Sequence, residues 1–471
     1  MAKLFYRFRN IKSLLGFEEL EKQTIYFAPP EDLNDPMEGY KDIVWNGDEI
    51  VWKNFFRHYL LCLERVTSLL IIGGEEYYTI TEKDIPIFQS YDDFPTLQYQ
   101  ETFEKISSEF LTFILPLIQK ISERTTSIRR DELHTYLDSV HFIALNIIEK
   151  NYIEKGFIPN NQNLHKNDTK GLEYIIQIID NIENISNIKE STFADEDFFL
   201  LAKNMAKNLK LSQHIEHKLV IDKPNRNFVF MDFIDIYLNN IEKLIYPNWY
   251  TSCFMTECEN SSVWGHYGDN HKGVCLIFES DEFDNISLNG ISSWGSQDAN
   301  KSYHNYKFKK INYENKFPEI DFFSSLGRLT VHSLKTGWYS DENGNVSDIS
   351  KVVLDNQDKW REEYWKNHEK PFLVKTKDWE YEKEYRLILS STLSDYEKVE
   401  DRLLNYKFNS LKGLIFGMKT STEDKLKIID ILNKKCDEEN REDFELYEAY
   451  FSHKKQNIQH SKISFWRQNI H

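Results

Sequence analysis

The chain of 471 residues has few cysteines, glycines and prolines. Its five cysteines lie at irregular intervals, and no two have the C-x-x-C spacing of a zinc or redox motif. With 17 glycines and 11 prolines, the composition is that of a mostly ordered protein. The glycines form no dinucleotide-binding or Walker fingerprint, and the sequence has no GxSxG, HExxH or DFG-like element. The sequence therefore favours a reduced protein and supports neither a Rossmann site nor a P-loop.

Long apolar runs and a basic charge excess are also lacking. The most apolar stretch, Phe110–Ile118, is too short to span a bilayer. Arg7, Arg9 and Lys12 interrupt the N-terminal segment, so no signal peptide is expected. The formal net charge of −18 disfavours generic binding to a nucleic-acid backbone. We expect a cytoplasmic protein with no membrane partner.

The middle of the chain has helical periodicity. Apolar residues recur at three- and four-residue steps over 103–121, over 133–148 with Asp131 as the expected N-cap, and over 172–185. The long polar segment Phe157–Lys170 is expected to be a loop. Residues 49–245 are therefore predicted to form a large α-helical insertion.

The segments on either side of this insertion are rich in β-forming residues. They predict a discontinuous α+β core over 1–48 and 246–453, with a split sheet of mixed and antiparallel strands, followed by a polar C-terminal tail over 454–471. The candidate strands are Leu4–Phe8, Ile25–Ala28, Trp249–Met255, Gly273–Phe278, Phe308–Tyr313, Tyr385–Ser390 and Gly413–Phe416.

Three short polar segments, Tyr6–Arg9, Thr251–Phe254 and Glu382–Arg386, suggest a single site. An arginine, then a serine on a strand, then a Glu-x-Glu pair is the order of polar groups in one class of ADP-ribosyltransferases. The resemblance implies an ADP-ribosyltransferase-like core that uses NAD, with Glu384 stabilising positive charge at the ribose and Glu382 directed towards the acceptor. Residues two apart on a strand share a face, so both carboxylates could enter one cleft. The structural alternative is a solvated strand on which Glu384 pairs with Arg386.

Arg7, Arg9 and Ser252 are the candidate ligands of the dinucleotide. Arginine forks match phosphate oxygens in a bidentate manner, so Arg7 and Arg9 are expected on the pyrophosphate, Arg7 before Arg9. The alternative for both is a salt bridge to Glu382 or Glu384. Ser252 is expected to hydrogen-bond the ribose, although a serine at an ordinary strand position would look the same.

The segment from Trp264 to His271 is rich in aromatic and polar residues. Trp264 or Tyr267 is predicted to stack on a nicotinamide or adenine ring, and the alternative is that both simply pack. The histidines and aspartate in this segment match no metal-ligand spacing, so no metal site is predicted. Upstream, Asn34–Pro36 predicts a rigid turn, which could also line a cleft.

The chain resembles a widespread bacterial family described as domain of unknown function 2971. The family has no settled activity, and its members resemble abortive-infection proteins of phage defence. The helical block over 49–245 is longer than the family usually carries there. The resemblance rests on Leu4–Arg9, Ile25–Pro36, Ser252–Phe254, Val263–Leu276, Trp379–Arg386 and Leu414–Met418.

Three functions remain open from the sequence. The first is a bacterial anti-phage defence or toxin-type effector that is an NAD-dependent ADP-ribosyltransferase, with a protein, a nucleic acid or water as acceptor. The second is a non-catalytic sensor or toxin-neutralising module that binds a nucleotide or a partner protein of a defence operon. The third is a metal-dependent nuclease.

Overall fold

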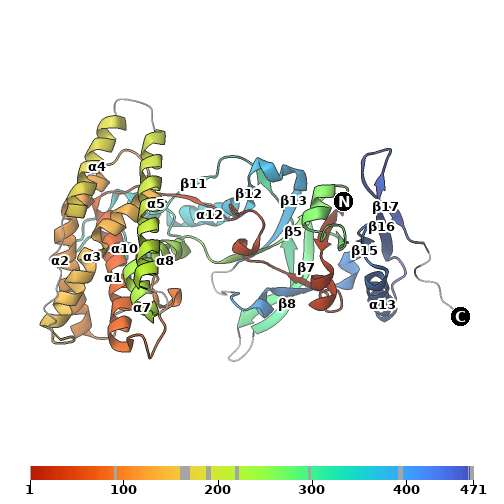
Figure 1. Cartoon of the computed structure of the whole chain (residues 1–471), viewed down its shortest axis with the longest axis horizontal. Coiled ribbons are helices and arrows are strands. Elements are labelled where there is room, and N and C mark those ends of the chain that lie inside the picture. Colours follow the sequence, from red (N-terminus) through yellow and green to blue (C-terminus); the bar gives the residue numbers. More distant parts are fainter. Residues whose placement is uncertain are drawn as a thin grey trace. The chain divides into compact units, whose positions relative to one another are not determined.

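The computed structural model describes residues 2–89, 93–159, 170–186, 192–217, 222–294, 299–390, 396–464 and 466. The chain divides into two compact units (Figure 1). Unit 1 comprises Met1–Tyr40, Pro247–Pro318 and Glu369–His471, and unit 2 comprises Lys41–Tyr246 and Glu319–His368. The predicted division kept residues 319–368 with the core, whereas the structure groups them with the helical unit. Most of the predicted loop Phe157–Lys170 lies outside the described residues.

Unit 1 is built on a mixed sheet, which confirms the predicted α+β class with mixed and antiparallel pairing. In the described part of the chain this sheet has eight strands, and only β15 and β16 pair in parallel. Strand β17 falls in the segment predicted to be a polar tail. The order across the sheet is β17 (Asn457–Lys462), β16 (Glu445–Ser452), β15 (Leu411–Phe416), β6 (Val274–Glu279), β1 (Leu4–Arg9), β5 (Trp249–Met255), β13 (Glu384–Ser390) and β9 (Lys309–Lys310).

The sheet opens between two of its inner strands, β1 and β5. They pair at one position, Tyr6 opposite Met255. In contrast, β1 pairs with β6 along its whole length, and β5 does so with β13. Beyond the shared position, Ala28 exchanges backbone hydrogen bonds of 2.8 Å with Thr251. The segment after β2 therefore takes the place of β1 beside β5, and the gap between the strands is where a site can form.

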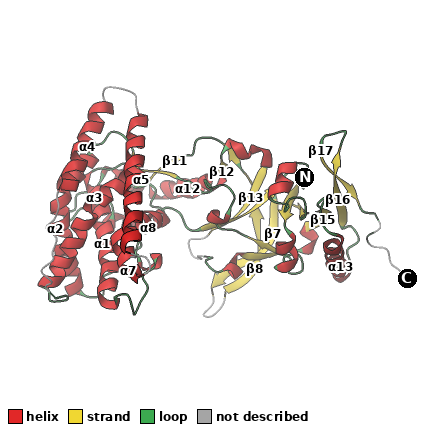
Figure 2. Cartoon of the chain, viewed as in Figure 1, coloured by secondary structure: helices red, strands yellow, loops and turns green. Residues whose placement is uncertain are grey.

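Smaller strands and helices complete unit 1 around this sheet (Figure 2). An apolar core that includes Phe5, Phe254, Leu276 and Leu387 lies on one sheet face. A smaller cluster around Phe8, Met255 and Trp264 lies on the other. The remaining elements are the antiparallel sheet β2 (Thr24–Tyr26), β14 (Leu403–Tyr406), β7 (Asn285–Trp294) and β8 (Ala299–Lys307), the parallel pair β10 (Asn312–Tyr313) and β12 (Val374–Lys375), and helices α9 (Ser261–His266) and α13 (Thr422–Glu438).

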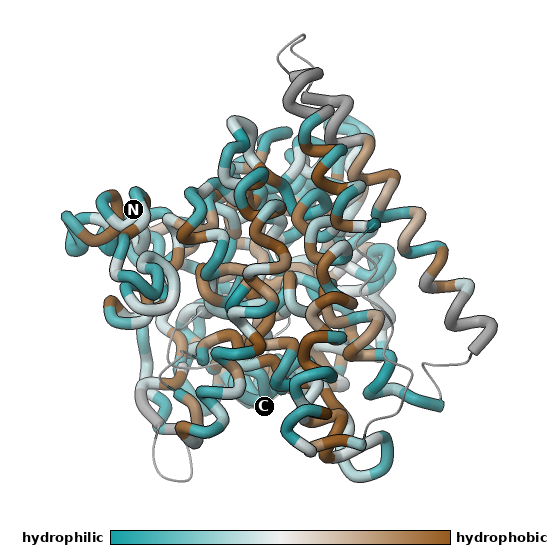
Figure 3. Tube along the Cα trace, turned by 90° about the vertical axis from the view of Figure 1, so that its left-hand side faces the viewer, coloured by the Kyte–Doolittle hydropathy of each residue, from teal (hydrophilic) through white to brown (hydrophobic). Residues whose placement is uncertain are grey.

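Unit 2 is mainly helical, and its long helices α1, α2 and α3 pack side by side (Figure 1). Apolar and polar stretches alternate along the helices, as Figure 3 shows, because one face of each helix is buried. The elements are α1 (Glu49–Gly73), α2 (Leu97–Ser122), α3 (Arg130–Glu154), α4 (Lys170–Ser186), α5 (Thr192–His217), α7 (Pro224–Asn227), α8 (Phe233–Ile241), α10 (Val331–Gly337), α11 (Asp348–Leu354), α12 (Gln357–Asn367) and the sheet β11 (Glu319–Asp321), β3 (Asp42–Trp45) and β4 (Ile128–Arg129).

The predicted N-cap of α3 was wrong. Arg129 occupies that position and Asp131 lies in the first turn, because β4 pairs with β3 up to Arg129 and runs directly into the helix. Asp48 caps α1 as an acidic side chain should, accepting hydrogen bonds from the backbone of Ile50 and Val51.

None of the helices in the described ranges is both long and apolar enough to cross a membrane.

A buried histidine, His58 of α1, holds two parts of unit 2 together. Its Nδ1 lies 3.0 Å from the Tyr237 hydroxyl and its Nε2 lies 2.9 Å from the Ile87 carbonyl oxygen. Burial lowers the pKa of His58 from 6.5 to about 4, so the folded protein keeps this ring neutral where the unfolded chain protonates it.

We expect unit 2 to lose stability as the pH falls from 6.5 towards 4. In this window the unfolded state binds a proton that folded His58 does not, so the stabilisation is complete above 6.5 and declines below it. The loss amounts to about 3 kcal/mol of unfolding free energy. Denaturant unfolding of wild type and His58→Gln at several pH values measures it. If the free energy of unfolding of His58→Gln falls as steeply with pH between 6.5 and 4 as that of the wild type, other groups cause the loss.

Candidate functional site

A cavity of about 840 Å³ lies in unit 1, where β1 and β5 diverge. Its wall includes the β1 segment Arg7–Arg9 and the β5 segment Thr251–Cys253. Glu38, Tyr267 and Lys375 line it from other parts of the unit. The volume falls within the range of roughly 300 to 1,000 Å³ that small-molecule sites occupy. The cavity is thus large enough for a ligand of nucleotide size.

Arg7 is a buried cation in the wall of this cavity, and among the described residues it forms no ion pair with a carboxylate. Its side chain comes from β1, and the residue is 4% exposed. Nη2 donates to the Tyr26 carbonyl oxygen at 3.1 Å, whereas Nη1 is buried with no hydrogen-bond partner. Burial lowers the pKa of Arg7 to about 10, so the guanidinium remains charged at neutral pH. An unpaired buried charge is costly, which makes Arg7 the strongest single sign of an anionic ligand.

Arg9 and Ser252 also line the cavity, and they differ in whether their polar atoms are already paired. Arg9 is already paired, because its guanidinium forks onto both carboxylate oxygens of Glu19. Ser252, 3% exposed, has a buried Oγ without a partner. The structure thus brings the predicted ligands Arg7, Arg9 and Ser252 to one cavity, and two of them carry unsatisfied polar atoms.

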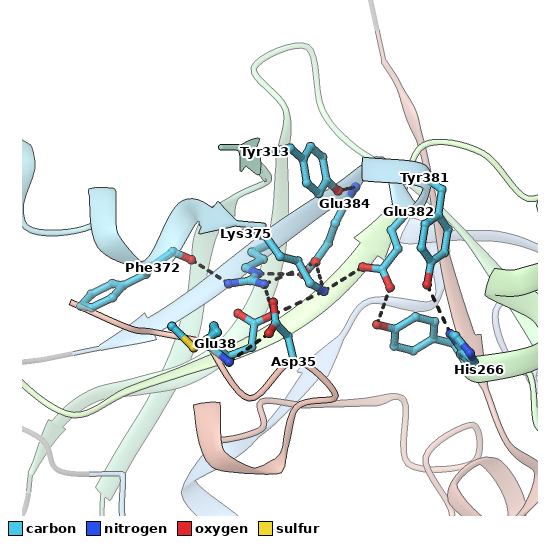
Figure 4. A network of polar contacts seen from close by, with 12 residues as sticks. Asp35, Glu38, His266, Tyr313, Phe372, Lys375, Tyr381, Glu382 and Glu384 are labelled. Carbon is cyan, nitrogen blue, oxygen red and sulfur yellow. Dashed lines mark hydrogen bonds and ion pairs between the residues drawn. The ribbon is translucent and has the colours of Figure 1, made fainter. Parts of the chain in front are cut away.

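Glu382 and Glu384 belong to a buried ion-pair network, shown in Figure 4. Lys375 Nζ lies 2.8 Å from Glu382 Oε2, 3.2 Å from Glu384 Oε2 and 3.3 Å from Glu38 Oε1. Arg386 joins the same group: Nε donates to Glu384 Oε1 and Nη2 to Glu38 Oε1, both at 2.7 Å. Three carboxylates therefore share two cations in the interior of unit 1.

The three carboxylates differ in their pKa. Burial acts against the ionised form of Glu384, but Arg386 and Lys375 outweigh it and lower the pKa to about 2. Burial raises the pKa of Glu38 despite Arg386, and it raises the pKa of Glu382 despite Lys375. The pKa of Lys375 is raised because the surrounding carboxylates outweigh its burial. Glu384 is thus the fixed anion of the network, and Glu38 and Glu382 are the members that take up a proton first.

The Glu-x-Glu pair does not share a regular strand, which corrects the geometry predicted for it. Glu382 ends the short 3-10 helix Lys377–Glu382, and Lys383 is left-handed with a φ of 49°. Glu384 is the first residue of β13, opposite Met255. Met255 belongs to the smaller core cluster, as does Phe8, the residue after Arg7. By strand alternation Arg7 therefore shares the opposite sheet face with Phe5 of the larger core. Among the described residues that line the cavity, neither Glu382 nor Glu384 is included, and both reach it through Lys375.

The two aromatic candidates have different environments. Trp264 is fully buried, meets Phe8 edge-on and donates from Nε1 to the Cys258 carbonyl oxygen at 2.8 Å, so it packs rather than stacks on a ligand. Tyr267 follows α9, lines the cavity and donates its hydroxyl to Glu382 Oε1 at 2.7 Å. Trp379 provides a further aromatic ring near the site, and the centroid of this ring lies 4.5 Å from Lys375 Nζ.

Glu38 and Lys375 are the site residues that sequence reasoning missed. Glu38 lies just after the Asn34–Pro36 turn, whose possible role in lining a cleft was the one available signal. Asn34 itself lines the cavity. Lys375 lies in the two-residue strand β12, and nothing in its local sequence marks it.

Comparison with known proteins gives a partial match. Residues 263–387 match the model of a family described as "Protein of unknown function (DUF2971)". This range contains the whole of Val263–Leu276 and of Trp379–Arg386, so the match supports the resemblance to this family drawn from the sequence. Neither the curated proteins nor the solved structures include a match. Within the described ranges, no three His, Cys, Asp or Glu side chains are grouped so as to hold a metal ion.

Proposed function

We propose that unit 1 binds a phosphate-bearing nucleotide in the cavity between β1 and β5, with NAD as the candidate substrate. The observation that carries the proposal is Arg7, a buried guanidinium that forms no ion pair within the described residues and whose Nη1 donates no hydrogen bond there. A phosphate supplies the missing negative charge and accepts the unused donor. Ser252 Oγ, also unsatisfied, supplies a hydrogen bond to a ribose or phosphate oxygen.

The reaction that suits these residues is transfer or hydrolysis of the ADP-ribosyl group. In this proposal Arg7 binds the pyrophosphate, and Arg9, held by Glu19, adds positive charge beside it. Tyr267 is the aromatic residue in contact with the cavity. Glu382 and Glu384 keep the charged Lys375 at the cavity wall. The acceptor is a protein, a nucleic acid or water.

One observation favours a second candidate, a nucleotide-binding module without catalysis. Both carboxylate oxygens of Glu384 are taken up, Oε1 by Arg386 and Oε2 by Lys375. A sensor would use this network only to hold the cavity in shape. For either function, the resemblance to abortive-infection proteins favours a role in anti-phage defence.

The test is binding and turnover of NAD by the full chain. We expect calorimetry to show saturable binding of NAD and of ADP-ribose, and weaker binding of nicotinamide, which lacks a phosphate. NAD labelled in its adenine moiety is then followed in cell extract with and without phage infection. Label on a macromolecule supports transfer of the ADP-ribosyl group, and labelled free ADP-ribose supports its hydrolysis. Binding without turnover supports the module, and no binding of either nucleotide overturns the proposal.

A further inference from the structure

We propose that Glu38, rather than Glu384, is the catalytic carboxylate that acts on the substrate in this cavity. The inference rests on the proposed function and assigns the reacting group within it. Glu38 lines the cavity that Arg7 and Ser252 also line. It is the member of the carboxylate network that combines this position with an unused oxygen.

The hydrogen bonds of the three carboxylates show the difference (Figure 4). Glu38 receives Arg386 Nη2 at 2.7 Å and Lys375 Nζ at 3.3 Å on the same oxygen, Oε1. Its Oε2 is buried and has no hydrogen-bond partner in the part of the chain that the structure describes. Glu384 uses Oε1 for Arg386 and Oε2 for Lys375. Glu382 uses Oε1 for Tyr267 and Oε2 for Lys375. Of the three carboxylates, Glu38 therefore both lines the cavity and keeps one oxygen uncommitted among the described residues.

The turn that carries Glu38 fixes its position. Asp35 Oδ1 accepts a hydrogen bond from the Met37 backbone at 2.9 Å, and the Glu38 backbone donates to the Asp35 carbonyl oxygen at 3.0 Å. Gly39 follows with a φ of +68°, and a Cβ there would lie 2.7 Å from the Trp249 ring. Only glycine suits this left-handed and crowded position, so the chain reverses directly behind Glu38. A catalytic group needs such a fixed position.

The chemistry balances without a metal or an oxidant. The bond between ribose C1′ and the nicotinamide nitrogen breaks, and its electron pair leaves with nicotinamide, which becomes neutral. Ionised Glu38 stabilises the positive charge that develops at C1′. The acceptor hydroxyl or water then bonds to C1′ through its oxygen and gives its proton to Glu38 Oε2. The raised pKa of Glu38, caused by burial, makes it a better base than Glu384.

The experiment compares Glu38→Gln with Glu384→Gln in the full chain, measuring NAD affinity by calorimetry and nicotinamide release with labelled NAD. Glutamine keeps an acceptor for Arg386 but cannot take the proton. We expect Glu38→Gln to bind NAD within about 3-fold of wild type and to release nicotinamide about 100-fold more slowly. Glu31→Gln, an exposed residue of the same loop, is the matched control and should keep wild-type release.

A second variant separates catalysis from folding. Glu38→Ala should regain release when formate is added, because formate supplies a carboxylate in the vacated space, which a purely structural residue would not show. Full release by Glu38→Gln, or no rescue of Glu38→Ala, overturns the inference. Wild-type binding without release also overturns it and leaves nucleotide binding standing. Absence of NAD binding by the wild type overturns both proposals.

Discussion

Arg7→Met is expected to remove nucleotide binding while leaving the ligand-free protein nearly as stable as the wild type. The guanidinium is buried and charged, and Glu19, the carboxylate that attracts it, is already paired with Arg9, so the folded protein gains little from the charge itself. Methionine keeps the unbranched stem and removes the cost of the unpaired cation. Loss of the hydrogen bond to the Tyr26 carbonyl oxygen lowers the free energy of unfolding by about 1 kcal/mol. This loss offsets the gain from removing the unpaired charge, so the net change in stability is small.

Binding should respond much more strongly than stability. Truncating a buried charge that pairs with a charged ligand group costs about 2 to 5 kcal/mol of binding free energy. Calorimetry with ADP-ribose measures this loss, and denaturant unfolding of the ligand-free protein measures the stability. Arg226→Met, which removes an exposed arginine from unit 2, should change neither. Retained ADP-ribose affinity together with a large loss of stability would mean that Arg7 is structural and that the ligand lies elsewhere.

The strands were predictable where the sequence carries its own boundaries. Trp249–Met255 matches β5 at both ends, because Pro247 stops the preceding helix and the apolar, β-forming run ends at Thr256. The predicted Tyr385–Ser390 matches β13 apart from Glu384 at its start. Among the blocks that carry the family resemblance, Leu4–Arg9 is β1, Ser252–Phe254 lies within β5, and Trp379–Arg386 ends in β13, and all three belong to unit 1.

The carboxylate network was not predictable, because long-range pairing decides it. Glu38 and Arg386 are 348 residues apart and meet across the core of unit 1. The alternation rule placed Glu382 and Glu384 on one strand face, but left-handed Lys383 interrupts the strand between them. The local sequence pattern identifies side chains that are capable of catalysis. Tertiary contacts decide which carboxylate oxygen remains unpaired, and this unpaired oxygen distinguishes Glu38 from Glu382 and Glu384.

The same network predicts a large loss of stability for Lys375→Met. Removing the ammonium leaves Glu38, Glu382 and Glu384 in the interior with Arg386 as the cation that remains in the group. Breaking a buried ion pair by removing one partner costs about 3 to 5 kcal/mol, because the other charge stays buried and uncompensated. We therefore expect the free energy of unfolding at neutral pH to fall by this amount in denaturant experiments.

The pH dependence identifies the cause of that loss. Lys375 acts to lower the pKa of all three carboxylates, so in its absence these pKa values rise and protonation at mildly acidic pH removes the uncompensated charge. The difference in unfolding free energy between wild type and Lys375→Met should therefore shrink as the pH falls. Lys383→Met is the matched control, because Lys383 pairs with Glu257 at the surface, where such a pair contributes about 0 to 1 kcal/mol. A difference that stays constant with pH would assign the loss to packing of the Lys375 side chain against Trp379 rather than to the charge it neutralises.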